Sequence, residues 1–509
     1  MEHVGEFLQS LCLKYEDKIC IIDESESEIS YTDFYNTIIA AQSYFAAYKL
    51  PKHFRFSIVK SNSLEYLTGL FALQNLGGIA VNLNPNLTNS EIEERLNLVE
   101  VDVLLCSETL FEEHKEMLTN SELRFVFTNK EGLDYLSYSA LELHTEKRKS
   151  MPILENTLFL QFTGGTTGLT KAAVITHQNV LANIEQLDVH MAQYIELKDL
   201  RVLVAFPFYH IFSLVFNLLF FMRQGGTCVL YKDLRDTKKI THLFKKHQPN
   251  FTVGVNTWYK KLMQSPEFRT LDFSNIRASL AGAEYVPLKT KEDWRALTGK
   301  PLFSAYGLTE TCSLAIVSPL NDQENEEDSI GIPIPQTEVR LLSEYNNWIE
   351  EDVVPGEIVL KGPQLTSGYF SNEEETKAAF FEGWLKTGDI AVRKKGVFYK
   401  IVDRKKDMIN VSGNKVYPNE VEEALLRIPG VLDVAIVGQH STRSGEHVVA
   451  CIVKEEEIEL DESVLIAHCR KHLSAFKVPK AIYWYKALPK TPIGKTARNI
   501  LRKDVNLHS

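Results

Sequence analysis

The sequence has few cysteines and no pattern that would pair them. Its seven cysteines are scattered over 509 residues, odd in number and without a Cys-x-x-Cys pair. This usage is typical of reduced thiols in a cytosolic protein.

Long hydrophobic runs are also missing. The most apolar segment, residues 211–222, is interrupted by Ser213 and Asn217 and is too short to span a bilayer. It therefore predicts a buried helix. Residues 1–6 are acidic and lack a basic n-region, so we expect no signal peptide.

Basic residues are fewer than acidic residues. Lysine and arginine total 56 against 67 aspartates and glutamates, a formal net charge of -11. This balance disfavours a general nucleic-acid binder, although it permits a local basic pocket for a phosphorylated ligand. We find no fixed-period repeat and no low-complexity stretch.

The remaining composition, 44% hydrophobic and 24% charged, is that of a globular enzyme, and the length predicts two or more domains. Helical and strand-like segments alternate over the first two thirds, which favours doubly wound parallel sheets in an α/β fold. We expect helices at 63–76 (amphipathic) and 89–98, a turn and a short strand within 77–82, and strands at 101–106, 203–206, 227–231 and 251–254.

The pattern changes late in the chain. Residues 356–361, 383–391 and 397–402 indicate β-hairpins, and a dense charge run, residues 403–407, follows them. Beyond it we expect a helix at 419–427, a strand at 431–438 and a helix at 463–473. We place a domain boundary at the charge run, because a tail of about a hundred residues is a common size for a small domain.

One loop is suited to binding phosphate. Thr163-Gly164-Gly165-Thr166-Thr167-Gly168-Leu169-Thr170-Lys171 follows an apolar strand at 158–162. Its glycines allow close backbone approach, successive N–H groups form an anion-binding nest, and Lys171 adds positive charge. It is not a Walker A loop, because no Gly-Lys-Ser/Thr follows at the required spacing. A flexible Gly/Thr turn is the alternative.

Two further motifs are weaker on their own. Tyr306-Gly307-Leu308-Thr309-Glu310 combines a ring that can stack on a purine with a carboxylate that can hold Mg²⁺, but it also suits a surface turn. Gly494-Lys495-Thr496 imitates the end of a Walker loop without its first glycine, so a solvated loop is the simpler interpretation.

Taken in order, the motifs resemble those of the adenylate-forming enzymes, the superfamily of acyl-CoA synthetases, nonribosomal peptide adenylation domains and firefly luciferases. The resemblance runs from about residue 31 to 502. It rests on residues 163–171, 306–310, 383–389, 403–407 and 489–495. The amino-acid sequences at 160–168, 207–212, 254–257 and 401–409 are similar to those of bacterial long-chain fatty-acyl-CoA synthetases.

The resemblance implies an architecture and a reaction. A large N-terminal domain, residues 1–403, would combine doubly wound sheets with a β-barrel-like subdomain, and residues 404–509 would form a small mobile α+β domain. The expected enzyme activates a fatty acid with ATP and Mg²⁺ to an acyl-adenylate, then forms a thioester with CoA as co-substrate. We expect it in the cytoplasm, with transient contact at the inner face of the membrane.

The resemblance also assigns roles to single residues. In the nucleotide site, the Thr163–Lys171 loop would grip the β- and γ-phosphates, Tyr306 would stack on adenine opposite Gly282, Ala283 and Glu284, and Asp389 and Arg404 would hold the ribose. Thr309 would reach the α-phosphate and Glu310 would hold Mg²⁺. Lys495 would bridge the α-phosphate and the attacking carboxylate. His210 would lie near the acyl carbonyl, unless it is an ordinary core histidine. Lys406 would be the hinge, and Ser412 and Gly413 would line the CoA tunnel.

Some residues differ from those that are common at the same positions in the family's motifs. Ala172 and Ala305 stand where glycine is common, and residues 281–284 contain less glycine than the bacterial long-chain wording. These changes leave the charged residues intact but affect the expected shape of the acyl pocket. His468 and His472, four apart on a predicted helix, are interpreted as a solvated helix face rather than a metal site.

Three functions stay open from the sequence alone: a fatty-acyl-CoA ligase, an acyl-adenylate ligase that loads a carrier protein, and a silent nucleotide-binding protein. A ligase for medium-chain or aryl acids is a variant of the first. Retention of Lys171, Glu310, Asp389, Arg404 and Lys495 argues against silence. The oligomeric state is not specified by the sequence.

Overall fold

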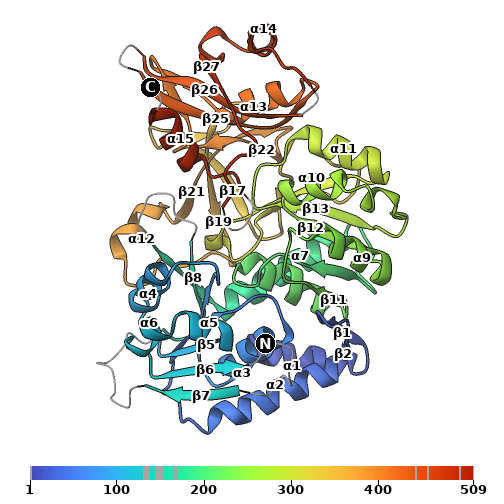
Figure 1. Cartoon of the computed structure of the whole chain (residues 1–509), viewed down its shortest axis with the longest axis vertical. Helices are drawn as coiled ribbons and strands as arrows, with labels where there is room; N and C mark the ends of the chain where they lie inside the picture. Colours follow the sequence, from blue (N-terminus) through green and yellow to red (C-terminus); the bar gives the residue numbers. More distant parts are fainter. Residues whose placement is uncertain are drawn as a thin grey trace.

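The computed structural model describes residues 3–129, 138–143, 154–163, 170–441, 444–455, 458–491 and 495–507. Within these ranges the strands form four sheets. Figure 1 shows the N-terminal elements at one end of the long axis and the C-terminal elements at the other.

Two large, mostly parallel sheets make up the body of the molecule, as the β-α alternation predicts. The first has seven strands in the order β7 (Tyr138–Glu142), β6 (Phe125–Asn129), β5 (Val103–Ser107), β3 (Arg55–Val59), β4 (Ile79–Leu83), β8 (Thr157–Phe162) and β9 (Ala172–Thr176). Only the outer pairs, β6 with β7 and β8 with β9, are antiparallel. Strand β8 lies between β4 and the edge strand β9, and its carboxyl end leads directly into residue 163.

The second sheet has nine strands. Their order is β16 (Ile332–Pro333), β15 (Ile316–Val317), β14 (Leu302–Tyr306), β13 (Ala278–Gly282), β12 (Phe251–Gly254), β10 (Arg201–Val204), β11 (Thr227–Leu230), β1 (Ile19–Ile22) and β2 (Glu28–Ser30). Strands β12, β13 and β14 are parallel neighbours. Their carboxyl ends meet at one edge, which is where ligands bind in open α/β sheets.

Helices pack around both sheets. They are α1 (Val4–Tyr15), α2 (Tyr31–Ala46), α3 (Leu64–Asn75), α4 (Asn89–Leu98), α5 (Glu108–Glu113), α6 (Lys115–Thr119), α7 (His177–Ala192), α9 (Thr237–His247), α10 (Asn256–Gln264) and α11 (Leu288–Thr298). The amphipathic character predicted for α3 is wrong, since every residue from Leu64 to Leu73 is buried. Helix α3 is covered because it packs against α1, α2 and the strands β3 and β4.

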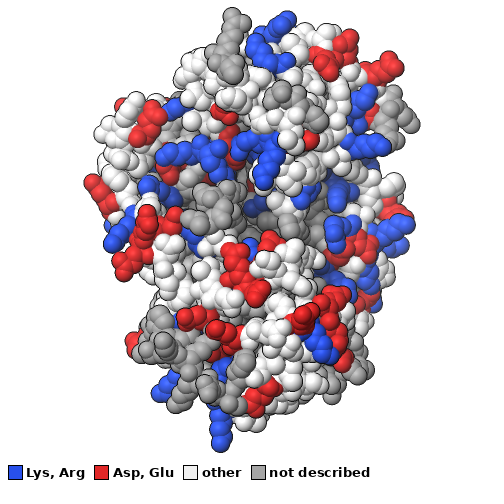
Figure 2. Space-filling view, turned by 60° about the vertical axis from the view of Figure 1, so that its left-hand side comes forward, with Lys and Arg blue, Asp and Glu red and all other residues white. Residues whose placement is uncertain are grey.

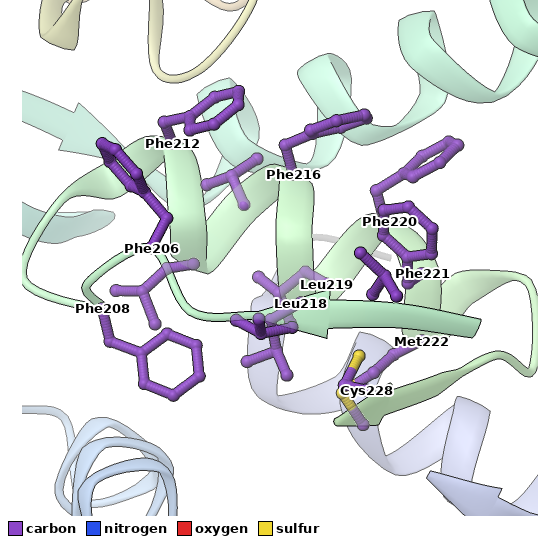
Figure 3. Close-up of a cluster of buried hydrophobic side chains, with 14 of the residues drawn as sticks. Phe206, Phe208, Phe212, Phe216, Leu218, Leu219, Phe220, Phe221, Met222 and Cys228 are labelled. Atoms are coloured by element: carbon purple, nitrogen blue, oxygen red, sulfur yellow. The ribbon is translucent and has the colours of Figure 1, made fainter. Parts of the chain in front are cut away.

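The apolar segment at 211–222 is a buried helix, as predicted, with an unexpected geometry. Ser213–Phe220 forms a π-helix, η1, which continues into α8 (Phe221–Arg223). Figure 3 shows Phe212, Phe216 and Phe220 in a row along one side of it. Their ring centroids are 5.6 and 5.2 Å apart in succession. This aromatic row anchors the chain just after His210.

A six-stranded antiparallel sheet corresponds to the predicted hairpins. It consists of β18 (Trp348–Ile349), β17 (Glu338–Leu342), β19 (Gly356–Lys361), β21 (Trp384–Lys394) and β20 (Phe380–Phe381), with β22 (Phe398–Arg404) paired to β21. Helix α12 (Glu373–Ala379) lies beside it. The β21–β22 pairing brings Asp389 opposite Arg404.

The C-terminal residues build a separate core. Strands β24 (Asn414–Val416), β23 (Ile409–Val411), β26 (Gly445–Lys454), β25 (Val431–Ser441) and β27 (Ala481–Trp484) form a sheet. Helices α13 (Pro418–Leu426), α14 (Glu462–His472) and α15 (Arg498–Leu507) pack on it. The buried apolar cluster around Ile436 and Leu465 draws all its members from residue 409 onward.

The state of the cysteines and the absence of a membrane-spanning segment were both predicted from the sequence. All seven cysteines are buried and free, so the expectation of unpaired thiols is confirmed. In the described ranges, every helix is too short or too polar to cross a membrane.

Candidate active site

A cavity of about 690 Å³ lies where three parts of the chain meet. The ends of β13 and β14 contribute Ala283, Glu284 and Tyr306, and the antiparallel sheet contributes Asp389 and Arg404. The C-terminal part contributes further residues, among them Lys406 and Lys495. Residues more than 200 positions apart in the sequence thus line one space.

Asp389 is a fixed, buried carboxylate in this cavity. It is 4% exposed, accepts a hydrogen bond from Tyr306 Oη at 2.7 Å, and lies 3.1 Å from Arg404 Nε. The neighbouring carboxylate raises the pKa of Arg404, and burial together with Asp389 raises the pKa of Tyr306. Two different elements therefore hold Asp389 in one orientation.

Lys495 brings a positive charge close to this carboxylate without forming a direct ion pair with it. Burial, and then repulsion from Arg404, lowers the pKa of Lys495 to about 8. Its backbone is pinned, since Lys495 N donates to Thr491 Oγ1 at 3.1 Å and Thr491 N donates to Lys495 O at 2.7 Å. No carboxylate of the described residues lies within ion-pair distance of Lys495. A half-buried ammonium without such a partner suits an anionic ligand.

The carboxylate of Glu284, in the N-terminal part of the chain, also lies near the Lys495 ammonium. Its Oε1 accepts from Thr257 N at 2.9 Å, at the start of α10. Burial raises its pKa, and Lys495 opposes that rise. The turn before it is tight: a Cβ at Gly282 would lie 2.5 Å from Ala305 O, and Ala283 has a φ of 62°. Glycine at 282 is thus required by the approach of β13 to β14.

A second cluster surrounds Glu310. Thr309 and Glu310 lie in a short 3₁₀ turn, η3 (Thr309–Thr311), and Glu310 Oε1 accepts from Tyr369 Oη at 2.7 Å. Lys171 Nζ lies 4.8 Å above the Tyr369 ring. At the base of the predicted phosphate loop, Thr163 N donates to Lys171 O at 3.0 Å. Gly164, Gly165, Thr166, Thr167 and Gly168 lie outside the described residues.

The face of the molecule seen in Figure 2 carries basic side chains across its middle, around a hollowed part of the surface, although the chain is acidic overall. This gathering is a local basic region of the kind that the composition permits. It favours an anionic ligand at long range.

Comparison with known proteins agrees with this geometry. The AMP-binding enzyme family matches residues 8–370, and the AMP-binding enzyme C-terminal domain matches residues 420–495. The chain belongs to the AMP-binding enzyme family.

Relatives within this family match nearly end to end. A long-chain-fatty-acid–CoA ligase of Escherichia coli O6:H1 is 36% identical over 90% of this chain and 88% of its own. One of Yersinia pestis is 34% identical over 98% and 94%. The ATP-bound crystal structure of MatB from Rhodopseudomonas palustris superposes with a TM-score of 0.87, covering 97% of this chain and 98% of that one at 24% identity. That likeness shows a shared fold.

His210 is not among the residues that line this cavity, although it lies close enough to Lys495 for that cation to affect its pKa. Burial, and then Lys495, lowers the pKa of His210 to about 3, so the imidazole is neutral at ordinary pH. Its Nδ1 atom is buried, without a hydrogen-bond partner among the described residues, and its ring meets Phe206 edge to face at 5.2 Å.

Two buried amides hold the loop that carries His210. Gln161 Nε2 donates to Tyr209 O at 2.9 Å, and Asn62 Oδ1 accepts from Phe208 N at 2.7 Å. The sequence analysis missed both, and it missed Tyr369. A polar residue inside an apolar strand, such as Gln161 in β8, was the available signal.

The predicted hinge and tunnel residues occupy different places. Lys406 lines the cavity, and burial, then Arg404, lowers its pKa to about 8. Ser412 and Gly413 form an exposed hairpin turn between β23 and β24, with φ of 51° and 85°. Neither lines the cavity, so the structure brings Lys495, and not this turn, to that space.

The two histidines of α14 form no metal cluster. The rings of His468 and His472 are 4.5 Å apart. In the described part of the chain, no group of three histidine, cysteine or acidic residues could hold a metal.

Proposed function

We propose that this AMP-binding enzyme is an ATP-dependent acid–CoA ligase for long-chain fatty acids. The convergence of Lys495 and the Tyr306–Asp389–Arg404 group on one cavity carries the proposal, since a ribose needs a hydrogen-bonding carboxylate and a phosphate needs a cation. The names of the relatives that match over 90% or more of the chain supply the substrate class.

The first step would be attack by a fatty-acid carboxylate oxygen on the α-phosphorus of ATP. A P–O bond forms, and pyrophosphate leaves with the electron pair of the broken P–O bond. Lys495 would stabilise the charge that grows on the α-phosphate oxygens, and Thr309 would donate a hydrogen bond there. Tyr306 and Ala283 would enclose adenine, with Gly282 and Glu284 shaping that wall.

The second step would be attack by the CoA thiolate on the acyl carbon. A C–S bond forms, AMP leaves with the electrons of the C–O bond, and the thiol proton passes to solvent. Neutral His210 would lie beside the acyl carbonyl. The Thr163–Lys171 loop, including Gly164 to Gly168, would have released pyrophosphate before this step.

Magnesium fits the Glu310 cluster only together with the substrate. Glu310 Oε1 accepts from Tyr369 Oη, and Oε2 remains for a metal. No second acidic residue completes a cage among the described ranges. Glu310, phosphate oxygens and waters would together supply the octahedral ligands that Mg²⁺ prefers. Bound there, the ion would neutralise charge on the departing phosphates.

We propose the boundary at residues 403–407, with a mobile domain from residue 404. Its own core begins at Ile409. Two contacts outside the hydrophobic cores would hold this domain in its orientation against the rest of the chain. Lys260 Nζ donates to Leu432 O at 2.7 Å, and Tyr285 bonds to Glu423. Breaking these contacts and turning about Lys406 would withdraw Lys495 and admit the Ser412–Gly413 turn to the CoA path.

We further propose that the enzyme works in the cytoplasm with transient contact at the inner face of the membrane. The support is chemical: long-chain fatty acids partition into bilayers.

The test is release of pyrophosphate from ATP with acids of graded chain length and with aromatic acids, each with and without CoA. We expect turnover with long-chain fatty acids, sustained only when CoA is present, and an acyl-CoA product. Pyrophosphate release that stops after one equivalent with CoA present, and resumes with a carrier protein, would identify a carrier-loading enzyme. No release with any acid would contradict the ligase proposal.

The lowered pKa of Lys495 predicts a pH profile. A lysine is charged below its pKa, so the cation is present below about pH 8 and is lost as the pH rises through that value. We expect kcat/KM for ATP, which reports the free enzyme, to be level near pH 7 and to fall about tenfold per pH unit well above pH 8.

Lys406 has a similar pKa, so the profile needs a control. The same measurement on Lys406→Arg should retain the decline. Loss of the decline in that variant would assign it to Lys406 and refute the role given to Lys495.

A further inference from the structure

Lys171, the cation of the phosphate loop, has an ion-pair partner supplied by a distant helix. Its Nζ pairs with Glu375 Oε2, and the two side chains are 15% and 31% exposed. The residues are 204 positions apart. The pairing is therefore a product of the fold rather than of neighbouring positions on one element.

The backbone around Glu375 is firmly attached to the phosphate-loop strand. Phe370 N donates to Ala172 O at 2.8 Å, and Val174 N donates to Gly368 O at 3.0 Å. Asn372 then caps α12, because its Oδ1 accepts from Glu375 N at 3.0 Å. These bonds fix the start of α12 beside β9, so Glu375 is carried to Lys171 by anchored backbone.

Lys171 is also enclosed on its other side. The Tyr369 ring lies 4.8 Å from Nζ, and Tyr369 Oη donates to Glu310. Burial, followed by Glu310 and with Glu375 contributing, raises the pKa of Tyr369. The ammonium thus has a carboxylate directly bound and an aromatic ring close by before any ligand binds.

A phosphate that binds Lys171 must compete with this arrangement. The β- and γ-phosphates of a nucleoside triphosphate carry several negative charges and reach the phosphate loop, whereas a nucleoside monophosphate carries no β- or γ-phosphate. Ligand binding would exchange one anion for another at the same ammonium. Because the pair with Glu375 must break before Lys171 can contact the phosphates, the free energy of that pair opposes binding.

We propose that Glu375 is the internal counter-ion of Lys171 and sets the affinity of the enzyme for nucleoside triphosphate without altering its affinity for nucleoside monophosphate. This inference rests on the proposed function, because it takes Lys171 as a ligand of the β- and γ-phosphates. Glu375 is a specificity-determining residue in this view: it weakens binding of ATP and leaves AMP, the product, unaffected.

The test is equilibrium binding of ATP and of AMP, each with Mg²⁺ and without acid or CoA, measured by calorimetry on the full chain. Glu375→Gln should bind ATP about two- to fivefold more tightly than the natural protein, an increase of about the size of one partly exposed ion pair. Binding of AMP should change less than about twofold. Glu373→Gln is the matched control, since Glu373 lies on the same helix, is 91% exposed and pairs only with Lys377, at 3.4 Å, among the described residues.

A second pair of variants separates specific competition from a general change of charge. In a Lys171→Met background, Glu375→Gln should give no gain in ATP affinity, because the counter-ion has lost its cation. Glu375→Asp, which keeps the charge but shortens the side chain, should give a smaller gain than Glu375→Gln and serves if the glutamine variant folds poorly.

Several results would overturn the inference. They are unchanged or weaker ATP binding by both Glu375→Gln and Glu375→Asp, an equal gain for Glu373→Gln, an equal gain for AMP, or a gain that persists without Lys171. Failure of the proposed function is distinct, since the natural protein would then bind no ATP at all.

Discussion

Lys495→Ala should lower the rate of pyrophosphate release by a factor of about 10²–10³, the loss seen when one group that stabilises a charged transition state is removed. The same variant should form acyl-CoA from supplied acyl-adenylate at nearly the natural rate. The reason is that Lys495 lies in the cavity through a turn of the C-terminal part, and the proposed rotation removes it before the thiol attacks.

The two half-reactions are measured separately, by pyrophosphate release and by thioester formation. Lys503→Ala, at an exposed position on α15, should leave both unchanged. Equal loss of both half-reactions in Lys495→Ala, with unchanged thermal unfolding, would contradict the division of labour between two domain orientations.

Asp389→Asn should impair both half-reactions, which distinguishes it from Lys495→Ala. In the proposed mechanism the AMP group is present in each step, and Asp389 is the buried carboxylate that we propose binds its ribose. Replacing a charged acceptor weakens such a hydrogen bond by about 1.5–3 kcal/mol, so kcat/KM should fall about 10- to 150-fold. Arg404 also loses its anionic partner, which adds to the effect.

Two variants define the cause of that loss. Tyr306→Phe removes only the 2.7 Å hydrogen bond to Asp389 and should cost less than Asp389→Asn. Asp352→Asn removes a similar carboxylate partner, that of Arg393 at 2.8 Å, on the exposed part of the same sheet, and should leave activity unchanged. If Asp389→Asn impaired only pyrophosphate release, the assignment of Asp389 to the ribose would be wrong.

Much of the fold was predictable because its signals are local. The helix α4 and the strands β12 and β19 have the predicted bounds, since periodicity and turn residues mark their ends. Strand β10 begins and ends two residues earlier than predicted. The apolar run at 203–206 continues beyond the strand, so composition alone did not mark where pairing stops.

Other features required knowledge of neighbours. Helix α3 was predicted to be amphipathic but is buried from Leu64 to Leu73, because two helices and two strands contact it. The π-helix at Ser213–Phe220 has an ordinary apolar sequence, and the altered turn becomes visible only in the packed aromatic row.

The features of the site also fall into those that the sequence predicts and those that depend on packing. The residue types and loops were readable from the sequence, since a glycine–threonine loop with a lysine, or a Tyr-Gly-Leu-Thr-Glu run, owes its chemistry to adjacent residues. The partners of these residues were not readable. Tyr369, Gln161 and Glu375 come from segments whose proximity depends on how sheets and helices pack.

By itself, then, the sequence determined the α/β class, the positions of most elements, the family and the chemical character of each motif, because all of these depend on residues close together in the chain. Only the tertiary structure decided which charges meet. It set Lys495 beside Asp389 and Arg404, left Ser412 and Gly413 outside, and paired Lys171 with Glu375. Those encounters join segments up to hundreds of residues apart, and the burial that shifts the pKa of Lys495 exists only once they are packed together.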